Sequence, residues 1–213
     1  MLAIFKREFK SYFQNVIGWL FVAALLAVYG LYFYVYNLKN GYPYISYDLK
    51  GIGFIMMIAV PILTMRSLSD EKKTKTDQLM LTSPVSVGRI VAGKYFAMAA
   101  VYTIDIALFA LSPLVLSIYG KEELGEAYVA LFGYWLYGLS CIAVGLFISS
   151  ISESVIISAI LTFAALFLSY MMQSITGLIS SGGNLLTKVL NCFDLYTPFE
   201  NFVSGWFSVT SAV

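Results

Sequence analysis

Residues 16–36 read VIGWLFVAALLAVYGLYFYVY and contain no charged side chain over 21 consecutive positions. At about 1.5 Å per residue, a helix of that length crosses the roughly 30 Å hydrocarbon core of a bilayer. Of the 213 residues in the chain, 60% are hydrophobic and 12% are charged. Average soluble domains carry roughly 25% charged residues and cannot hide so much apolar surface. The composition therefore predicts a membrane protein.

Four further apolar runs approach spanning length, at about 49–66, 95–119, 128–149 and 155–178. The first of these is short before Arg66, so we expect its helix to tilt or to extend outward through residues 47–50. Together the five runs predict an all-α integral membrane protein with about five transmembrane helices. Residues 179–213 are mixed in character and predict an outer segment without a further span.

The N-terminal residues 1–14 carry an amphipathic pattern. Their apolar side chains recur at helical spacing, at Leu2, Phe5, Phe9 and Phe13. Their basic side chains fall largely on the other side, at Lys6, Arg7 and Lys10. This pattern predicts an interfacial helix in the headgroup layer, with its phenyl rings toward the hydrocarbon. The alternative is the frayed start of the first span.

The distribution of lysine and arginine predicts the orientation of the chain. With a cytoplasmic N-terminus, nine basic residues lie inside, at Lys6, Arg7, Lys10, Arg66, Lys72, Lys73, Lys75, Arg89 and Lys94. Four then lie outside, at Lys39, Lys50, Lys121 and Lys188. Because basic residues favour the cytoplasmic side, we expect a multi-pass protein of the plasma membrane with its N-terminus in the cytoplasm.

Several classes of function are disfavoured by the composition. The chain has no histidine, which is the commonest general base and metal ligand, and its two cysteines, Cys141 and Cys192, cannot form a disulfide framework. A net charge of +1 gives no basic field for nucleic acid. Residues 88–94 match the spacing of a phosphate-binding loop, but Tyr95 stands where Ser or Thr is needed. We expect no catalytic residues, no metal site and no cofactor on this chain.

The loop at residues 66–94 reads RSLSDEKKTKTDQLMLTSPVSVGRIVAGK. Ser67 or Ser69 can cap a helix that continues through residue 81 and stops before Pro84. This helix would dock on a cytoplasmic partner, with charges that steer the contact and apolar side chains that bury against it. The charged residues are Asp70, Glu71, Lys72, Lys73 and Asp77, and the apolar ones are Leu79, Met80 and Leu81. The alternative is a solvated loop that only obeys the positive-inside rule.

The same loop resembles the first cytoplasmic loop of ABC-2 type transporter permeases. The matching residues are Asp70-Glu71-Lys72-Lys73, Thr76, Gln78-Leu79-Met80-Leu81, Thr82-Ser83-Pro84-Val85-Ser86 and Gly93-Lys94. A second stretch, residues 196–202 (YTPFENF) followed by Gly205, is similar to the segment before the last span in the gliding-motility and copper-processing subfamily. A histidine often found near Pro198 in that subfamily is absent.

The resemblance implies six spans and a complex of two permease subunits, identical or paralogous, with two ABC ATPase subunits. ATP and Mg would be bound on the ATPase partner. It also implies that residues 66–94 form a coupling helix in a cleft of the ATPase and that residues 1–14 lie along the inner membrane surface. The sequence ends at Val213, where a sixth span would begin, so we expect a truncated chain.

Asp105 lies near the middle of the third predicted span. An ionisable side chain at that depth costs several kcal/mol and normally faces other helices, a partner charge or water. It marks either a translocation path or a subunit interface, or it hydrogen-bonds to a tyrosine or serine of a neighbouring helix.

The leading interpretation is the permease subunit of an ATP-driven exporter. The alternative is a membrane-embedded scaffold or assembly subunit that binds a cytoplasmic partner through the same loop without transport. A secondary transporter would need paired broken helices in two halves, whereas the prolines at 61 and 113 stand in non-corresponding places.

Overall fold

The structure is a computed structural model that describes residues 1–42, 44–76, 86–119, 124–179 and 194–203. Within these ranges every regular element is a helix, and five helical stretches are long and apolar enough to cross a membrane. These stretches are Val16–Lys39, Ser46–Lys73, Val87–Ile118, Leu124–Ile151 and Val155–Met172. The predicted all-α membrane fold with about five spans is thus confirmed.

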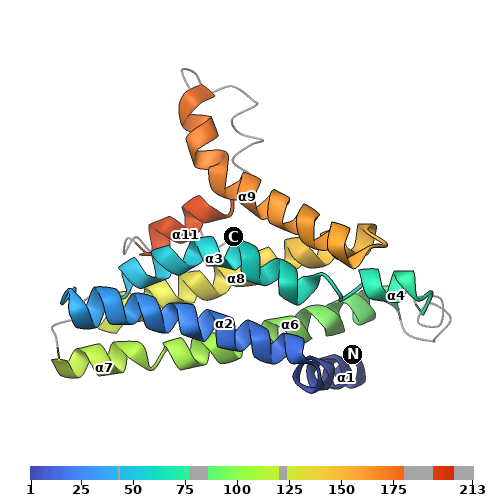
Figure 1. The fold of residues 1–213 in the computed structure, drawn as a ribbon, viewed down its shortest axis with the longest axis horizontal. Coiled ribbons are helices and arrows are strands. Elements are labelled where there is room, and N and C mark those ends of the chain that lie inside the picture. The colour runs from blue at the N-terminus through green and yellow to red at the C-terminus, as the bar shows by residue number, and fades with distance from the viewer. Residues whose placement is uncertain (43, 77–85, 120–123, 180–193, 204–213) are drawn as a thin grey trace.

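The chain folds into a bundle of long helices, with shorter helices at its ends and one against its side (Figure 1). In chain order the elements are α1 (Leu2–Gln14), α2 (Val16–Phe33), the π-helix η1 (Tyr34–Lys39), α3 (Ser46–Thr64), α4 (Ser69–Lys73), α6 (Val87–Phe109), α7 (Ser112–Tyr119), α8 (Leu124–Ile151), α9 (Val155–Ile179) and α11 (Tyr196–Val203). Because α3 begins at Ser46, the short second apolar run extends outward through residues 47–50 as expected.

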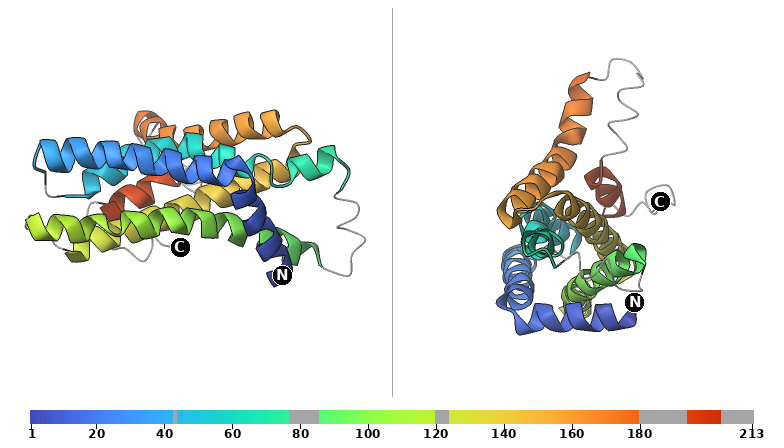
Figure 2. Two further views of the ribbon diagram at one scale, coloured as in Figure 1. Left: turned by 60° about the horizontal axis from the view of Figure 1, so that its bottom comes forward. Right: turned by 90° about the vertical axis from the view of Figure 1, so that its right-hand side faces the viewer.

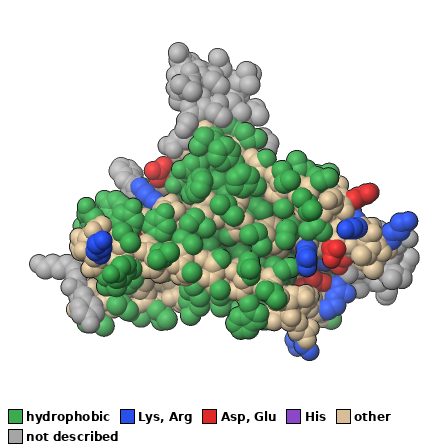
Figure 3. Space-filling model, in the orientation of Figure 1, with side chains coloured by type: hydrophobic (Ala, Val, Ile, Leu, Met, Phe, Trp, Pro, Cys, Tyr) green, Lys and Arg blue, Asp and Glu red, His purple; other side chains and the backbone are tan. Residues whose placement is uncertain are grey.

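Helix α3 is the centre of the bundle. It contacts α2, α8 and α9, and the short α11 packs against α3, α8 and α9. Its fully buried apolar side chains recur at helical spacing and include Leu49, Ile52, Met56, Val60 and Leu63. Apolar side chains also cover much of the outer surface (Figure 3), where a bilayer and not water is the solvent.

Helix α1 lies across the end of the bundle, against α2 and α6, and does not run along it (Figure 2). Its phenylalanines form a row, with ring centroids 5.8 Å apart for the stacked pair Phe5 and Phe9 and 5.0 Å apart for the tilted pair Phe9 and Phe13. Lys6 and Lys10 point to solvent. The helix is amphipathic as predicted, and Phe9 and Phe13 pack against the buried core of the bundle.

The third span is interrupted near its C-terminal end. Helix α6 stops at Phe109 and α7 starts at Ser112, with Pro113 in the first turn, where a proline is tolerated. Ser112 Oγ donates a hydrogen bond to the Phe109 carbonyl at 2.7 Å and is also bonded to the Tyr29 hydroxyl. Side chains thus satisfy polar groups freed by the break, as a membrane interior requires.

Helices α6 and α8 approach closely at Gly138. A Cβ added there would lie 2.3 Å from Cζ of Tyr102, whose ring is fully buried and whose hydroxyl donates to the Tyr134 carbonyl at 2.7 Å. Small residues at such crossings let membrane helices pack without a gap.

Replacing Gly138 by alanine should therefore destabilise the bundle. We expect Gly138→Ala to lower the free energy of unfolding by about 1–3 kcal/mol, because the new methyl group overpacks a fixed aromatic ring. The measurement is the thermal unfolding midpoint in detergent. Gly30→Ala is the matched control, since nothing lies within 4 Å of a Cβ built at Gly30. An equal response of the two variants would contradict the packing described.

Candidate functional site

Charged side chains gather at the end of the bundle where α1, α4 and the start of α6 meet (Figure 3). Four of them contact one another and are called the charge cluster below: Arg7, Glu8, Glu71 and Lys94. They come from three elements that lie far apart in the sequence, so the cluster holds these elements together.

Lys94 is the centre of the charge cluster. Its side chain is 2% exposed, and its Nζ donates to Glu71 Oε1 at 2.6 Å and to the Ser67 carbonyl at 2.7 Å. Glu8 Oε1 lies 3.6 Å from the same ammonium. A buried ammonium is stable only when paired and hydrogen-bonded. One side chain of α6 therefore fixes both α4 and α1.

The residue before Lys94 helps to bring α1 into place. A Cβ added to Gly93 would lie 3.0 Å from Cγ2 of Ile4 in α1, so a glycine lets the two helices approach. The Gly93-Lys94 pair thus has a structural explanation. The glycine leaves room for α1, and the lysine forms an ion pair with Glu8 of α1.

Arg7 and Tyr12 complete the contacts between α1 and the rest of this end. Arg7 lies 2.6 Å from Glu8 and 3.8 Å from Glu71, but it is 58% exposed, so water and salt screen its charge. The Tyr12 hydroxyl donates to the Leu63 carbonyl at 3.3 Å. Burial, together with the negative charge of Glu8, raises the pKa of Tyr12 well above its usual range, so the hydroxyl stays a donor.

Helix α4 is capped by a side chain from α8. Ser149 Oγ accepts hydrogen bonds from the backbone N–H groups of Leu68, at 3.1 Å, and of Ser69, at 3.2 Å. The prediction that Ser67 or Ser69 caps this helix is wrong. The Ser67 carbonyl accepts a hydrogen bond from Lys94, and the Ser69 hydroxyl donates one to the Met65 carbonyl.

The predicted helix through residue 81 is also wrong, because α4 ends at Lys73. Lys75 has a φ of 55°, a left-handed conformation that does not continue a helix. Lys72 donates to the Ser150 carbonyl of α8, whereas Asp70, Lys73 and Lys75 are exposed. The proposed docking residues Asp77, Leu79, Met80, Leu81 and Pro84 lie outside the described residues.

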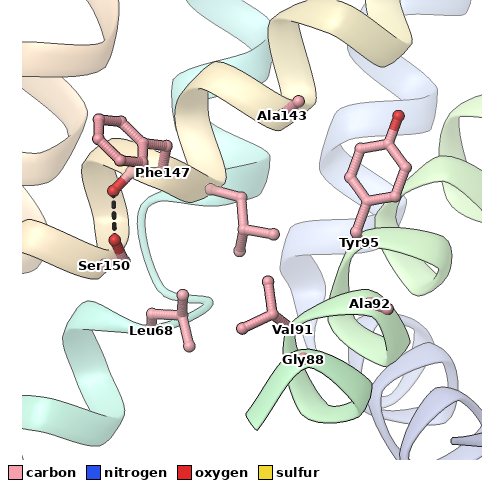
Figure 4. Close-up of a pocket in the computed structure, with 9 residues that line it drawn as sticks. Leu68, Gly88, Val91, Ala92, Tyr95, Ala143, Phe147 and Ser150 are labelled. Carbon is pink, nitrogen blue, oxygen red and sulfur yellow. Dashed lines mark hydrogen bonds between the residues drawn. The ribbon is translucent and has the colours of Figure 1, made fainter.

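Residues 88–94 form no phosphate-binding loop. They belong to one continuous helix, α6, and Lys94 is held by the charge cluster. Gly88 instead lines a cavity of about 500 Å³ between α6 and α8. Val91, Tyr95 and Phe147 contribute to its mostly apolar lining (Figure 4).

Asp105 is fully buried in α6, away from the charge cluster. Neither of its carboxylate oxygens has a hydrogen-bond partner among the described residues, so the bond expected to a tyrosine or serine is not found there. The Tyr134 hydroxyl of α8 is likewise buried without a partner in the part of the chain described.

Sequence reasoning missed Glu8, Tyr12 and Ser149 as parts of this site, and it identified Lys94 only as the last basic residue of the loop at residues 66–94. One signal was present: Glu8 is the lone acidic residue of the otherwise basic helix 1–14. The burial of Lys94 had no local signal, because it depends on α1 and α4 packing against α6.

The fold and the site define a multi-pass helical membrane protein with a charged interhelical segment fixed to three of its helices. The family model of ABC-2 family transporter proteins matches residues 31–204. The chain belongs to this family of membrane transport components. No curated protein and no solved structure matches the chain.

Removal of the Lys94 charge should destabilise the protein strongly. We expect Lys94→Met to lower the free energy of unfolding by about 3 kcal/mol, because Glu71 and Glu8 keep their charges at a partly buried site without a counter-ion. The double variant with Glu71→Gln should lose less than the sum of the single variants. The thermal unfolding midpoints of the two single variants and the double variant, measured in detergent, give these losses. Lys73→Met is the exposed control, and strict additivity would show that Lys94 and Glu71 are not coupled.

Loss of the Ser149 hydroxyl should loosen α4. We expect Ser149→Ala to cost about 1–2 kcal/mol and to speed amide exchange at Leu68 and Ser69, which lose their acceptor. Ser150→Ala is the control, because the Ser150 hydroxyl of the same helix donates locally, to the Phe147 carbonyl, and accepts no bond from α4 among the described residues. Equal exchange rates in the two variants would contradict a cap from α8.

Proposed function

We propose that this chain is the permease subunit of an ATP-driven exporter and that residues 66–94 couple its spans to a separate ATPase. Membership of the ABC-2 transporter family supports this proposal. The observation that carries it is the contact of Glu71 with Lys94, at 2.6 Å, which joins the loop segment α4 to the membrane helix α6. Movement imposed on α4 from outside would be passed directly to a span.

The two sides of α4 suit different tasks. Glu71 and Lys72 turn inward, to α6 and α8 respectively. Lys73 turns to solvent, where a partner could meet it. Charged side chains at such a surface steer and register a contact more than they tighten it. We assign binding of the ATPase to this outer side and transmission to the inner side.

Transmission would reach three helices at once. Lys94 joins α4 to α6, Ser149 joins it to α8, and Glu8 joins the same ammonium to α1. Closure of the ATPase on ATP and Mg would displace α4, and the attached helices would rock between inward-facing and outward-facing states. Hydrolysis itself belongs to the partner, and the role of this chain is conformational.

Two ATPase subunits and a second permease subunit, identical or paralogous, would complete the transporter in the plasma membrane. The gathering of charges at the end that holds α1 and α4 supports a cytoplasmic N-terminus (Figure 3). We keep the gliding-motility and copper-processing subfamily as part of the proposal, on residues 196–202. Asp105 would line the translocation path or a subunit interface in another conformational state of the transporter.

The Glu71→Gln variant tests this function. The change keeps the size of the side chain and one hydrogen bond to Lys94, but it removes the charge. We expect the ATPase partner to copurify with the tagged protein from its host in the usual ratio, and its stimulated ATP hydrolysis to fall about tenfold, equivalent to roughly 1.4 kcal/mol of lost coupling.

Glu126→Gln is the control, because Glu126 is exposed in the first turn of α8, outside residues 66–94, and its change should leave both quantities unchanged. A scaffold subunit would show undiminished ATP hydrolysis in Glu71→Gln. That result, or the absence of any ATPase from the unmodified preparation, would contradict the proposal.

A further inference from the structure

We propose that a cavity beside the charge cluster binds the headgroup of a phosphatidylethanolamine-type lipid. The cavity, called the headgroup pocket below, measures about 470 Å³ and lies between α1 and the connection from α3 to α4. This size is within the range of small-ligand sites, about 300–1,000 Å³. The inference concerns the membrane side of the protein and does not depend on an ATPase partner.

The formal charges that line the headgroup pocket are balanced. Three basic side chains, Arg7, Arg66 and Lys94, stand against three acidic ones, Glu8, Asp70 and Glu71. Such a lining favours neither a simple anion nor a simple cation. It matches a ligand that carries one charge of each sign close together.

Two of these six side chains are available to a ligand. Lys94, Glu71, Glu8 and Arg7 are engaged with one another in the charge cluster. Arg66 and Asp70 are exposed and make no ion pair within the described residues. The Arg66 guanidinium suits a phosphate, which it can hold with two hydrogen bonds. The Asp70 carboxylate suits a primary ammonium group.

The place of the headgroup pocket, beside the start of a spanning helix, points to a lipid as the source of the ligand. Asn15 and Ile17 line it, and they flank the first residue of the spanning helix α2. The outward side chains there are apolar, with Val16 75% exposed and Trp19 60% exposed. Indole rings of this kind mark the membrane–water interface. A headgroup in the pocket would leave its acyl chains beside α2.

The chemistry separates ethanolamine from the other common headgroups. Phosphatidylglycerol carries the phosphate but no cation for Asp70. Phosphatidylcholine carries both charges, but its quaternary nitrogen has no N–H group to donate to a carboxylate. Phosphatidylethanolamine offers both the anion and a hydrogen-bonding cation, so it satisfies Arg66 and Asp70 together.

The test is lipid binding to the full chain in detergent, followed by native mass spectrometry. The probes are phosphatidylethanolamine, phosphatidylcholine and phosphatidylglycerol with identical acyl chains. We expect phosphatidylethanolamine to bind at least about fivefold more tightly than the other two. Arg66→Gln and, independently, Asp70→Asn should each weaken its binding about tenfold, the loss of one charge-assisted contact.

Arg89→Gln is the matched control, an exposed arginine at the same end of the bundle that does not line the pocket. It should bind phosphatidylethanolamine like the unmodified protein. Equal binding of the three lipids, or unchanged binding in both Arg66→Gln and Asp70→Asn, would overturn the proposal. Competition by soluble phosphoethanolamine at equal concentration would also overturn it, because the ligand would then come from water and not from the membrane. Unfolding midpoints without lipid, equal among the variants, establish that folding is intact.

Discussion

The buried ammonium of Lys94 is the constraint on which the charged end of this protein depends. Removing such a group from water costs several kcal/mol unless carboxylates and carbonyls surround it. Here Glu71, Glu8 and the Ser67 carbonyl supply those partners, from two distant parts of the chain, residues 67–71 and helix α1. The positions of α1 and α4 follow, because neither can move away without leaving the ammonium partly unpaired.

This constraint explains how a five-residue helix persists at the end of a bundle. Isolated helices shorter than about 12 residues are marginal in water, so α4 owes its conformation to tertiary contacts. Ser149 supplies the acceptor for its first amides, and Lys94 holds its acidic turn. Farther along the bundle the stabilising forces are different. Close packing such as that of Gly138 against Tyr102 joins helices that present apolar surface to lipid.

The spans and the amphipathic N-terminal helix were predictable because their signals are local. Charge-free runs such as residues 16–36 and the helical spacing of Phe5, Phe9 and Phe13 indicate these helices directly. The site was predictable only in part. Glu71 and Asp70 were identified, but the ion pair between Glu71 and the buried Lys94 was not. The cap on Leu68 comes from a serine 81 positions away, and the burial of Lys94 requires Glu8 from another helix. Such long-range pairings leave no periodic trace in one sequence.

The most direct test of the role of Lys94 is the distance between α4 and α6, measured by electron–electron resonance between spin labels. Labels would replace Lys73 and Arg89, which are both exposed, in a chain whose Cys141 and Cys192 are changed to alanine. We expect one narrow distance distribution with Lys94 present and a broad one in the Lys94→Met variant, because α4 is then released from α6. The same narrow distribution in both proteins would show that α4 is held by other contacts and that the lysine does not link the loop to the span.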